Sequence, residues 1–167
     1  MEPWGATQFG DPCAECAFDW SISPQAAVRW VSLLHGRLAA ATSSATGTES
    51  RESGGWSVTQ YVCHVGDNLR QWTERIQGAL LAGAVEVVGY DPDELAIARR
   101  YETLPLAAAL WSTGQAIDTW AAVLPDAISD NVVLQHQTRG TQRAEDVARN
   151  NSHDAHHHLW DIQQILI

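Results

Sequence analysis

The chain contains no lysine, and all ten of its basic residues are arginine. Against these stand 20 acidic residues, so the formal net charge is −10. Only Arg99 and Arg100 are adjacent, and no basic patch is evident that could attract phosphate groups. This charge balance disfavours binding to nucleic acids and to anionic membranes.

Long hydrophobic runs and cysteine-rich segments are also missing. No apolar stretch reaches roughly 18 residues, so the sequence predicts no transmembrane helix. Residues 1–10 have neither a basic start nor an apolar run, so we expect no signal peptide. Three cysteines do not make a disulfide scaffold. We therefore expect a cytoplasmic protein with reduced thiols.

What is present fits one domain of 167 residues, 45% of them hydrophobic. Residues 1–22 contain scattered Pro and Gly and are expected to form an irregular segment that packs on the rest. Helical spacing of apolar residues recurs in the remainder, approximately at 23–41, 57–82, 105–124 and 142–167. The second of these has the clearest start, because Ser57 and Gln60 form a capping box.

Other segments are expected to connect these helices. A short helix is predicted at 92–100, and Pro125 should end the third long helix. Residues 126–140 then read as a loop with an extended piece at 132–134. Without a convincing strand pattern, residues 23–167 predict an all-α four-helix bundle with a long connection between helices two and three.

Seven histidines are present, and four of them lie between residues 153 and 158. His153 and His157 are four residues apart, so a helix projects both from one face, where they can share a metal ion. His64, on the second helix, has polar residues on its own face and can supply a third ligand. His156 and His158 point to either side and are expected outside the ligand set. A solvent-exposed polar face would also explain this pattern.

Three neutral imidazoles leave at least one coordination position open, which is typical of catalytic metal sites. Zn²⁺, Ni²⁺ and Fe²⁺ all accept imidazole, so the ligand type does not choose among them.

Three segments together resemble the DinB/YfiT-like superfamily, and its actinobacterial branch most closely: WSV at 56–58, CHVGD at 63–67 and HDAHHHLWDI at 153–162. The resemblance covers about residues 13–165. It implies a bundle of up-down-down-up topology and a divalent metal held by His64, His153 and His157. It also implies a thiol-dependent S-transferase or isomerase that uses mycothiol or bacillithiol.

Cys13 and Cys16 form a CxxC pair that resembles a CPECGFD-like segment of that branch. A zinc knuckle, a redox pair and plain packing are the open interpretations. Packing is favoured because Ala17 stands where a knuckle usually has Gly, and only Cys63 remains as a further thiol. We expect the pair to be separate from the histidines, and Cys63 to be a small buried residue.

Further candidates lie near the polar faces of these helices. Asp161 and Asp67 could orient His157 and His64, and with His156 they are the candidate bases for hydrolysis. Residues expected to contact a cofactor or substrate are Arg75, Arg149 and Trp160. The alternative is that the charged residues among them make ordinary surface ion pairs.

These features predict a metal-dependent, mycothiol-type thiol S-transferase or isomerase that acts on small electrophilic substrates. The alternatives are a hydrolase that uses a metal-bound water and a non-catalytic, stress-related metal-binding bundle. A small-molecule thiol and an electrophile are the expected partners, and a homodimer is the expected assembly.

Overall fold

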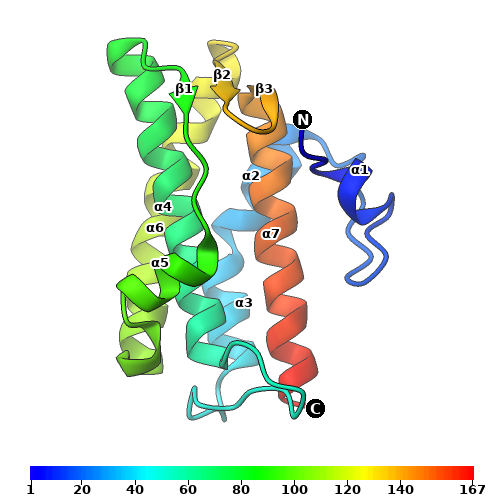
Figure 1. Ribbon diagram of the computed structural model, residues 1–167, viewed down its shortest axis with the longest axis vertical. Helices are drawn as coiled ribbons and strands as arrows, with labels where there is room; N and C mark the ends of the chain where they lie inside the picture. The colour runs from blue at the N-terminus through cyan, green and yellow to red at the C-terminus, as the bar shows by residue number, and fades with distance from the viewer.

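The structure is a computed structural model that describes residues 1–167, most of them in helices (Figure 1). In chain order the elements are α1 (Ala6–Phe9), α2 (Pro24–Ser32), α3 (Leu34–Ala41), α4 (Val58–Ala82), β1 (Glu86–Val87), α5 (Pro92–Ala98), the 3-10 turn η1 (Tyr101–Thr103), α6 (Leu106–Ser129), β2 (Val133–His136), β3 (Gly140–Arg143) and α7 (Ala144–Ile165).

Four helical rods form the body of the molecule: α2 with α3, then α4, α6 and α7 (Figure 1). Helix α4 packs along α6, and α7 packs against α2, α3 and α4. Trp120, Leu34 and Ile76 are among the fully buried side chains of the core between them. The prediction of a mainly helical protein is confirmed.

Local signals explain where α4 begins and ends. Ser57 Oγ accepts the backbone N–H of Gln60, and Gln60 Oε1 accepts that of Ser57 at 2.9 Å, so the predicted capping box is present. Gly83 ends the helix in the left-handed conformation, with φ of 63°. The first rod differs from its prediction, because Leu33 interrupts it between α2 and α3.

Two predictions for residues 105–140 are wrong. Helix α6 does not end at Pro125 but continues to Ser129, and Leu124 and Ala127 on either side of the proline are fully buried. Their burial offsets the backbone hydrogen bond that a proline removes. The predicted all-α class also misses a three-stranded sheet, in which β2 pairs parallel to β1 and antiparallel to β3. Strands β2 and β3 of this sheet form the connection between α6 and α7.

Residues 1–22 lie beside α7 (Figure 1). Cys13, Cys16 and Phe18 are buried there in a small apolar cluster of their own, against which Trp160 of α7 packs. The backbone N–H of Glu2 donates to the Thr138 carbonyl at 2.9 Å and ties the beginning of the segment to the β2–β3 turn.

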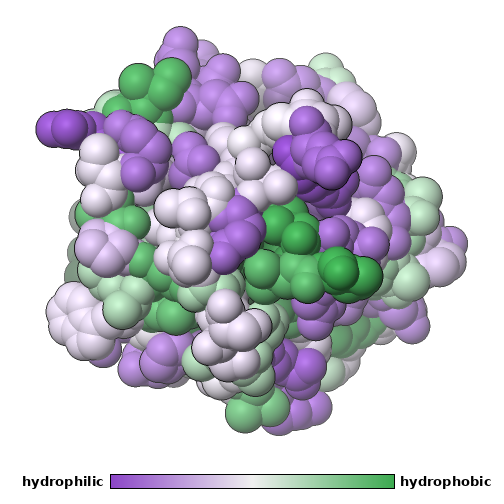
Figure 2. All heavy atoms as spheres, turned by 90° about the horizontal axis from the view of Figure 1, so that it is seen from below, coloured by the Kyte–Doolittle hydropathy of each residue, from purple (hydrophilic) through white to green (hydrophobic).

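The end of the molecule near the C-terminus is covered mainly by hydrophilic residues, with smaller hydrophobic areas between them (Figure 2). None of the helices combines the length and apolarity needed to span a membrane.

Candidate metal centres

A cavity of about 680 Å³ lies between α4, α7, the N-terminal segment and the turns around Tyr90 and Thr138. Only five of its 24 lining residues are hydrophobic. A cavity of this size and polarity suits a small polar ligand better than an apolar one.

One group of potential metal ligands lies on the wall of this cavity. We call it the cavity cluster, and it consists of His64, Asp154 and His158. Asp154 Oδ1 is 3.5 Å from His64 Nε2 and 3.6 Å from His158 Nε2. Two ligands that share one cation at about 2.1 Å with a tetrahedral angle lie about 3.4 Å apart. The spacing of the cluster therefore fits a shared ion.

The helices place these three side chains by simple geometry. Asp154 and His158 are four residues apart on α7, so they project from one face, and His64 meets them from α4. The ring centroid of His64 lies 4.8 Å from that of His158 and 4.8 Å from the Trp56 ring. Trp56 thus packs against the cluster and limits how far the His64 ring can move.

Neighbouring charges orient His158. Its Nδ1 lies 3.0 Å from Asp161 Oδ2, and Arg51 donates to the other carboxylate oxygen at 2.6 Å. Burial disfavours the charged imidazole, but Asp154 and Asp161 outweigh this and raise the pKa of His158 to about 9. The cluster therefore attracts a positive charge.

Asp154 stays ionised in the same cluster. Burial alone would raise its pKa, but His64 and His158 hold the pKa well below the usual range for an aspartate. An anionic oxygen flanked by two imidazoles is a donor set that divalent cations accept.

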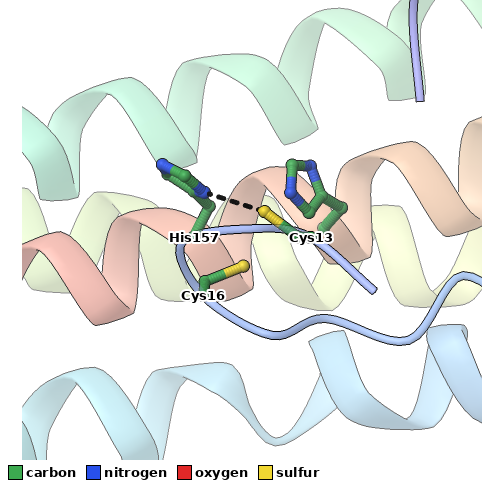
Figure 3. A group of neighbouring side chains, drawn as sticks. Cys13, Cys16 and His157 are labelled. Atoms are coloured by element: carbon green, nitrogen blue, oxygen red, sulfur yellow. Dashed lines mark hydrogen bonds between the residues drawn. The ribbon is translucent and has the colours of Figure 1, made fainter. Parts of the chain in front are cut away.

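A second group of potential ligands joins the N-terminal segment to α7. We call it the knuckle cluster, and it consists of Cys13, Cys16, His153 and His157. Cys13 Sγ lies 3.8 Å from His157 Nδ1 of α7. Cys16 lies near both, on the same loop as Cys13 (Figure 3). The prediction that the CxxC pair is separate from the histidines is wrong.

The two clusters divide the three histidines that were predicted to hold one metal. His64, His153 and His157 all line the cavity, but no group with ligand atoms within 4.8 Å of one another contains all three. His158, expected outside the ligand set, faces His64 on another helix and belongs to the cavity cluster. Sequence reasoning missed Asp154 as a potential ligand, although its spacing from His158 equals that of the His153–His157 pair.

Arg75, predicted to contact a cofactor or substrate, faces the cavity. It lines the cavity, with its guanidinium 4.7 Å from the centroid of the Trp72 ring, and donates to the Val88 carbonyl at 2.8 Å. Asp67, by contrast, does not line the cavity. It accepts hydrogen bonds from Arg99 and Tyr101 and serves to hold the α5–η1 connection on α4.

The remaining candidates lie outside the cavity. His156 packs against Trp30, with ring centroids 5.2 Å apart. Trp160 lies beside the knuckle cluster, 5.7 Å from the His157 ring. Arg149 donates to the Ile22 carbonyl at 3.0 Å and so holds the end of the N-terminal segment.

No model of a known protein family matches the chain, and no curated protein matches it. A solved structure does, with a TM-score of 0.76 and 18% identity over 85% of each chain. The two chains share one fold. That structure is YfiT from Bacillus subtilis, described as a probable metal-dependent hydrolase with an unusual four-helix bundle topology. The likeness supports the predicted architecture, and at this identity it extends to the fold alone.

Proposed function

We propose that the protein is a metal-dependent enzyme of the DinB/YfiT-like superfamily, with its divalent cation in the cavity cluster. The observation that carries the proposal is the position of three donor atoms around a common point on the wall of a polar cavity. A cation held by three protein ligands keeps a position open toward the cavity, the pattern of catalytic rather than structural sites. Such a cation supplies a Lewis acid and lowers the pKa of a thiol or water that reaches it.

The side chains around the cluster have separate tasks in this proposal. Asp161 fixes the ring of His158 so that Nε2 faces Asp154. Arg75 offers a guanidinium that can bind a carboxylate or another planar anion of the substrate. The rings of Trp72 and Tyr90 lie 4.7 and 5.7 Å from this guanidinium and hold it at the cavity wall.

The reaction class that we propose is transfer of a low-molecular-weight thiol, of the mycothiol type, to a small electrophile. The resemblance to thiol-dependent family members supports it, and a cavity of about 680 Å³ has room for a cofactor and a second substrate. Hydrolysis is the second candidate, since YfiT is described as a probable metal-dependent hydrolase.

The ligand set is tested by variants of α7. His158→Ala and Asp154→Asn should each lose the cavity metal, measured by elemental analysis after gel filtration. His156→Ala is the matched control, because its ring packs against Trp30 outside the cavity, and it should retain the metal. If both ligand variants keep full metal content, the cavity cluster is not the site. If His153→Ala loses the cavity metal while His158→Ala keeps it, the trio predicted from the sequence holds the ion instead.

The reaction class is tested with the metal-loaded protein. A model electrophile is incubated with and without a low-molecular-weight thiol, and ester and amide substrates are assayed in parallel. Turnover that requires the thiol and is lost in His158→Ala supports transfer. Thiol-independent cleavage of an ester or amide supports hydrolysis, and no metal-dependent turnover in either assay would contradict the enzymatic proposal.

A further inference from the structure

We propose that the knuckle cluster binds a second metal ion, a structural Zn²⁺ that fastens the N-terminal segment to α7. The inference goes beyond the proposed function, because the cluster shares no ligand with the cavity cluster. Two cysteines and two histidines form a complete set of four donors, the closed arrangement of structural zinc sites.

The distances agree with such a site. All four donor atoms lie within 4.8 Å of one another. With Zn–S of about 2.3 Å, Zn–N of about 2.0 Å and a tetrahedral angle, a sulfur and a nitrogen on one zinc are about 3.5 Å apart. Cys13 Sγ and His157 Nδ1 are separated by 3.8 Å, a weak hydrogen bond but close to the spacing of two zinc ligands.

The backbone of the CxxC loop has the form that a zinc knuckle requires. Ala17 adopts a positive φ of 57°, the conformation for which knuckles usually have glycine. Its N–H donates to the Cys13 carbonyl at 2.9 Å, and the Cys13 N–H donates to the Phe18 carbonyl at 2.9 Å. Alanine rarely accepts this conformation, so the surrounding structure must hold it there. The sequence-based objection to a knuckle is therefore removed.

Each histidine of the knuckle cluster has a ring nitrogen available to a metal ion. His153 Nε2 is buried and has no hydrogen-bond partner, which is costly unless something binds it. His157 Nε2 lies 3.1 Å from a Glu15 carboxylate oxygen, which leaves Nδ1 to face Cys13. A histidine that contacts a carboxylate through one nitrogen and a metal through the other is a common arrangement in metal sites.

Aromatic rings enclose the knuckle cluster. The rings of Phe9 and Trp20 lie 4.6 and 4.5 Å from the His153 ring, and Cys13, Cys16 and His153 are all buried. A cation bound among buried thiols keeps them as the thiolates that ligate it.

Metal stoichiometry tests the site. We expect two metal equivalents per chain in the wild type and one in the double variant Cys13→Ser/Cys16→Ser. Cys63→Ser is the matched control, because Cys63 is a buried free cysteine outside both clusters, and it should keep both. A circular dichroism spectrum confirms that each variant retains its helices.

The same experiment separates this proposal from the proposed function. One metal equivalent that the double variant loses and His158→Ala keeps would support the knuckle site and contradict the cavity site. One metal equivalent that His158→Ala loses and the double variant keeps would contradict the knuckle site. A wild-type protein purified under reducing conditions with a Cys13–Cys16 disulfide and no cysteine-dependent metal would also overturn it.

X-ray absorption at the zinc edge tests the donor set directly, with His158→Ala as the sample so that the knuckle site alone contributes. We expect two sulfur ligands at about 2.3 Å and two nitrogen ligands at about 2.0–2.1 Å. A coordination shell without sulfur would contradict the assignment.

Discussion

Two carboxylates have corresponding positions behind the two clusters. Asp161 Oδ2 lies 3.0 Å from Nδ1 of His158, and Glu15 Oε2 lies 3.1 Å from Nε2 of His157. Each contacts the nitrogen that faces away from the neighbouring ligand of its cluster. A carboxylate in this position fixes the tautomer of the ring and makes its free nitrogen a better donor.

Removing either charge should therefore weaken one site more than the other. We expect Asp161→Asn to lower the metal affinity of the cavity cluster by about 10- to 100-fold, and Glu15→Gln to do the same at the knuckle cluster. Competition titrations with a chromophoric chelator measure both affinities. If each variant weakens both sites equally, the carboxylates act on the fold as a whole and not through their histidines.

His136 on β2 is a different kind of residue, a buried imidazole held neutral. Burial lowers its pKa, and the charges of Arg139 and Arg75 add to this, whereas Glu2 opposes it. Its Nδ1 accepts the backbone N–H groups of Thr138 and Arg139, each at 3.3 Å. Protonation of Nδ1 would break both hydrogen bonds.

This arrangement predicts a loss of stability in acid. The folded state binds the proton less readily than the unfolded state, so the contribution of His136 is complete above the unfolded pKa of about 6.5. It is lost as the pH falls through the lowered pKa of the folded state. The free energy of unfolding should fall less between about pH 7 and pH 5 in His136→Gln than in the wild type. The exposed His35, changed to Gln, serves as control, and an unchanged pH dependence in His136→Gln would refute the explanation.

At the scale of elements, α4 and α6 approach closely because Gly66 lacks a side chain. A Cβ at Gly66 would lie 2.5 Å from Thr113 Oγ1 and 3.2 Å from Thr113 Cα. Thr113 in turn donates to the Val62 carbonyl at 2.9 Å. A small residue at position 66 is therefore required for the packing that sets where His64 lies.

Two glycine variants of the same helix should have opposite effects. Gly66→Ala should lower the free energy of unfolding by about 1–3 kcal/mol through overpacking. Gly78→Ala should raise it by up to about 1 kcal/mol, since its Cβ would meet only Ala84 at an ordinary 3.6 Å and alanine favours the helix. Chemical denaturation measures both, and a stabilised Gly66→Ala would contradict the close approach.

The elements predicted correctly from the sequence are those specified locally. The capping box of Ser57 and Gln60 lies within four successive residues, so the start of α4 could be read directly. The predicted helix end at Pro125 was wrong because the burial of its neighbours, and not the low helix propensity of proline, decides where α6 ends. Strands β2 and β3 have four residues each, too few for alternation to stand out, and their pairing is not local.

The candidate site shows the same division between local and distant information. Spacing alone indicated that His153 and His157 act together on one face of α7. What completes their cluster is Cys13, 144 residues from His157 in the sequence, and no local pattern connects the two. The contact between His158 and His64 could not be predicted from spacing either, because His64 comes from another helix.

At the scale of the whole molecule, the N-terminal segment is part of the cavity. Trp4, Gly5 and Phe9 line the cavity together with residues of α4 and α7. In our proposal the knuckle zinc holds this segment in place, so a structural ion determines whether one wall of the cavity is present.

Metal removal should therefore affect the molecule unevenly. We expect a zinc chelator to reduce the hydrogen-exchange protection of residues 6–20 while α4 and α6 keep theirs, because the apolar core does not depend on the metal. Hydrogen exchange with mass spectrometry measures this for each segment. In Cys13→Ser/Cys16→Ser the same segment should already be unprotected and insensitive to chelator. Uniform loss of protection along the chain would contradict a local role.

Helix α7 carries both pairs of ligands, 153 with 157 and 154 with 158, displaced by a single residue and so by about 100° around the helix axis. In our proposals the two ions would therefore occupy neighbouring faces of the same turns of α7. By thermodynamic linkage, any factor by which one ion changes the affinity for the other applies equally in the reverse direction. An effect of zinc at the non-reacting site on the metal of the cavity would thus be matched by an equal effect of that metal on the zinc.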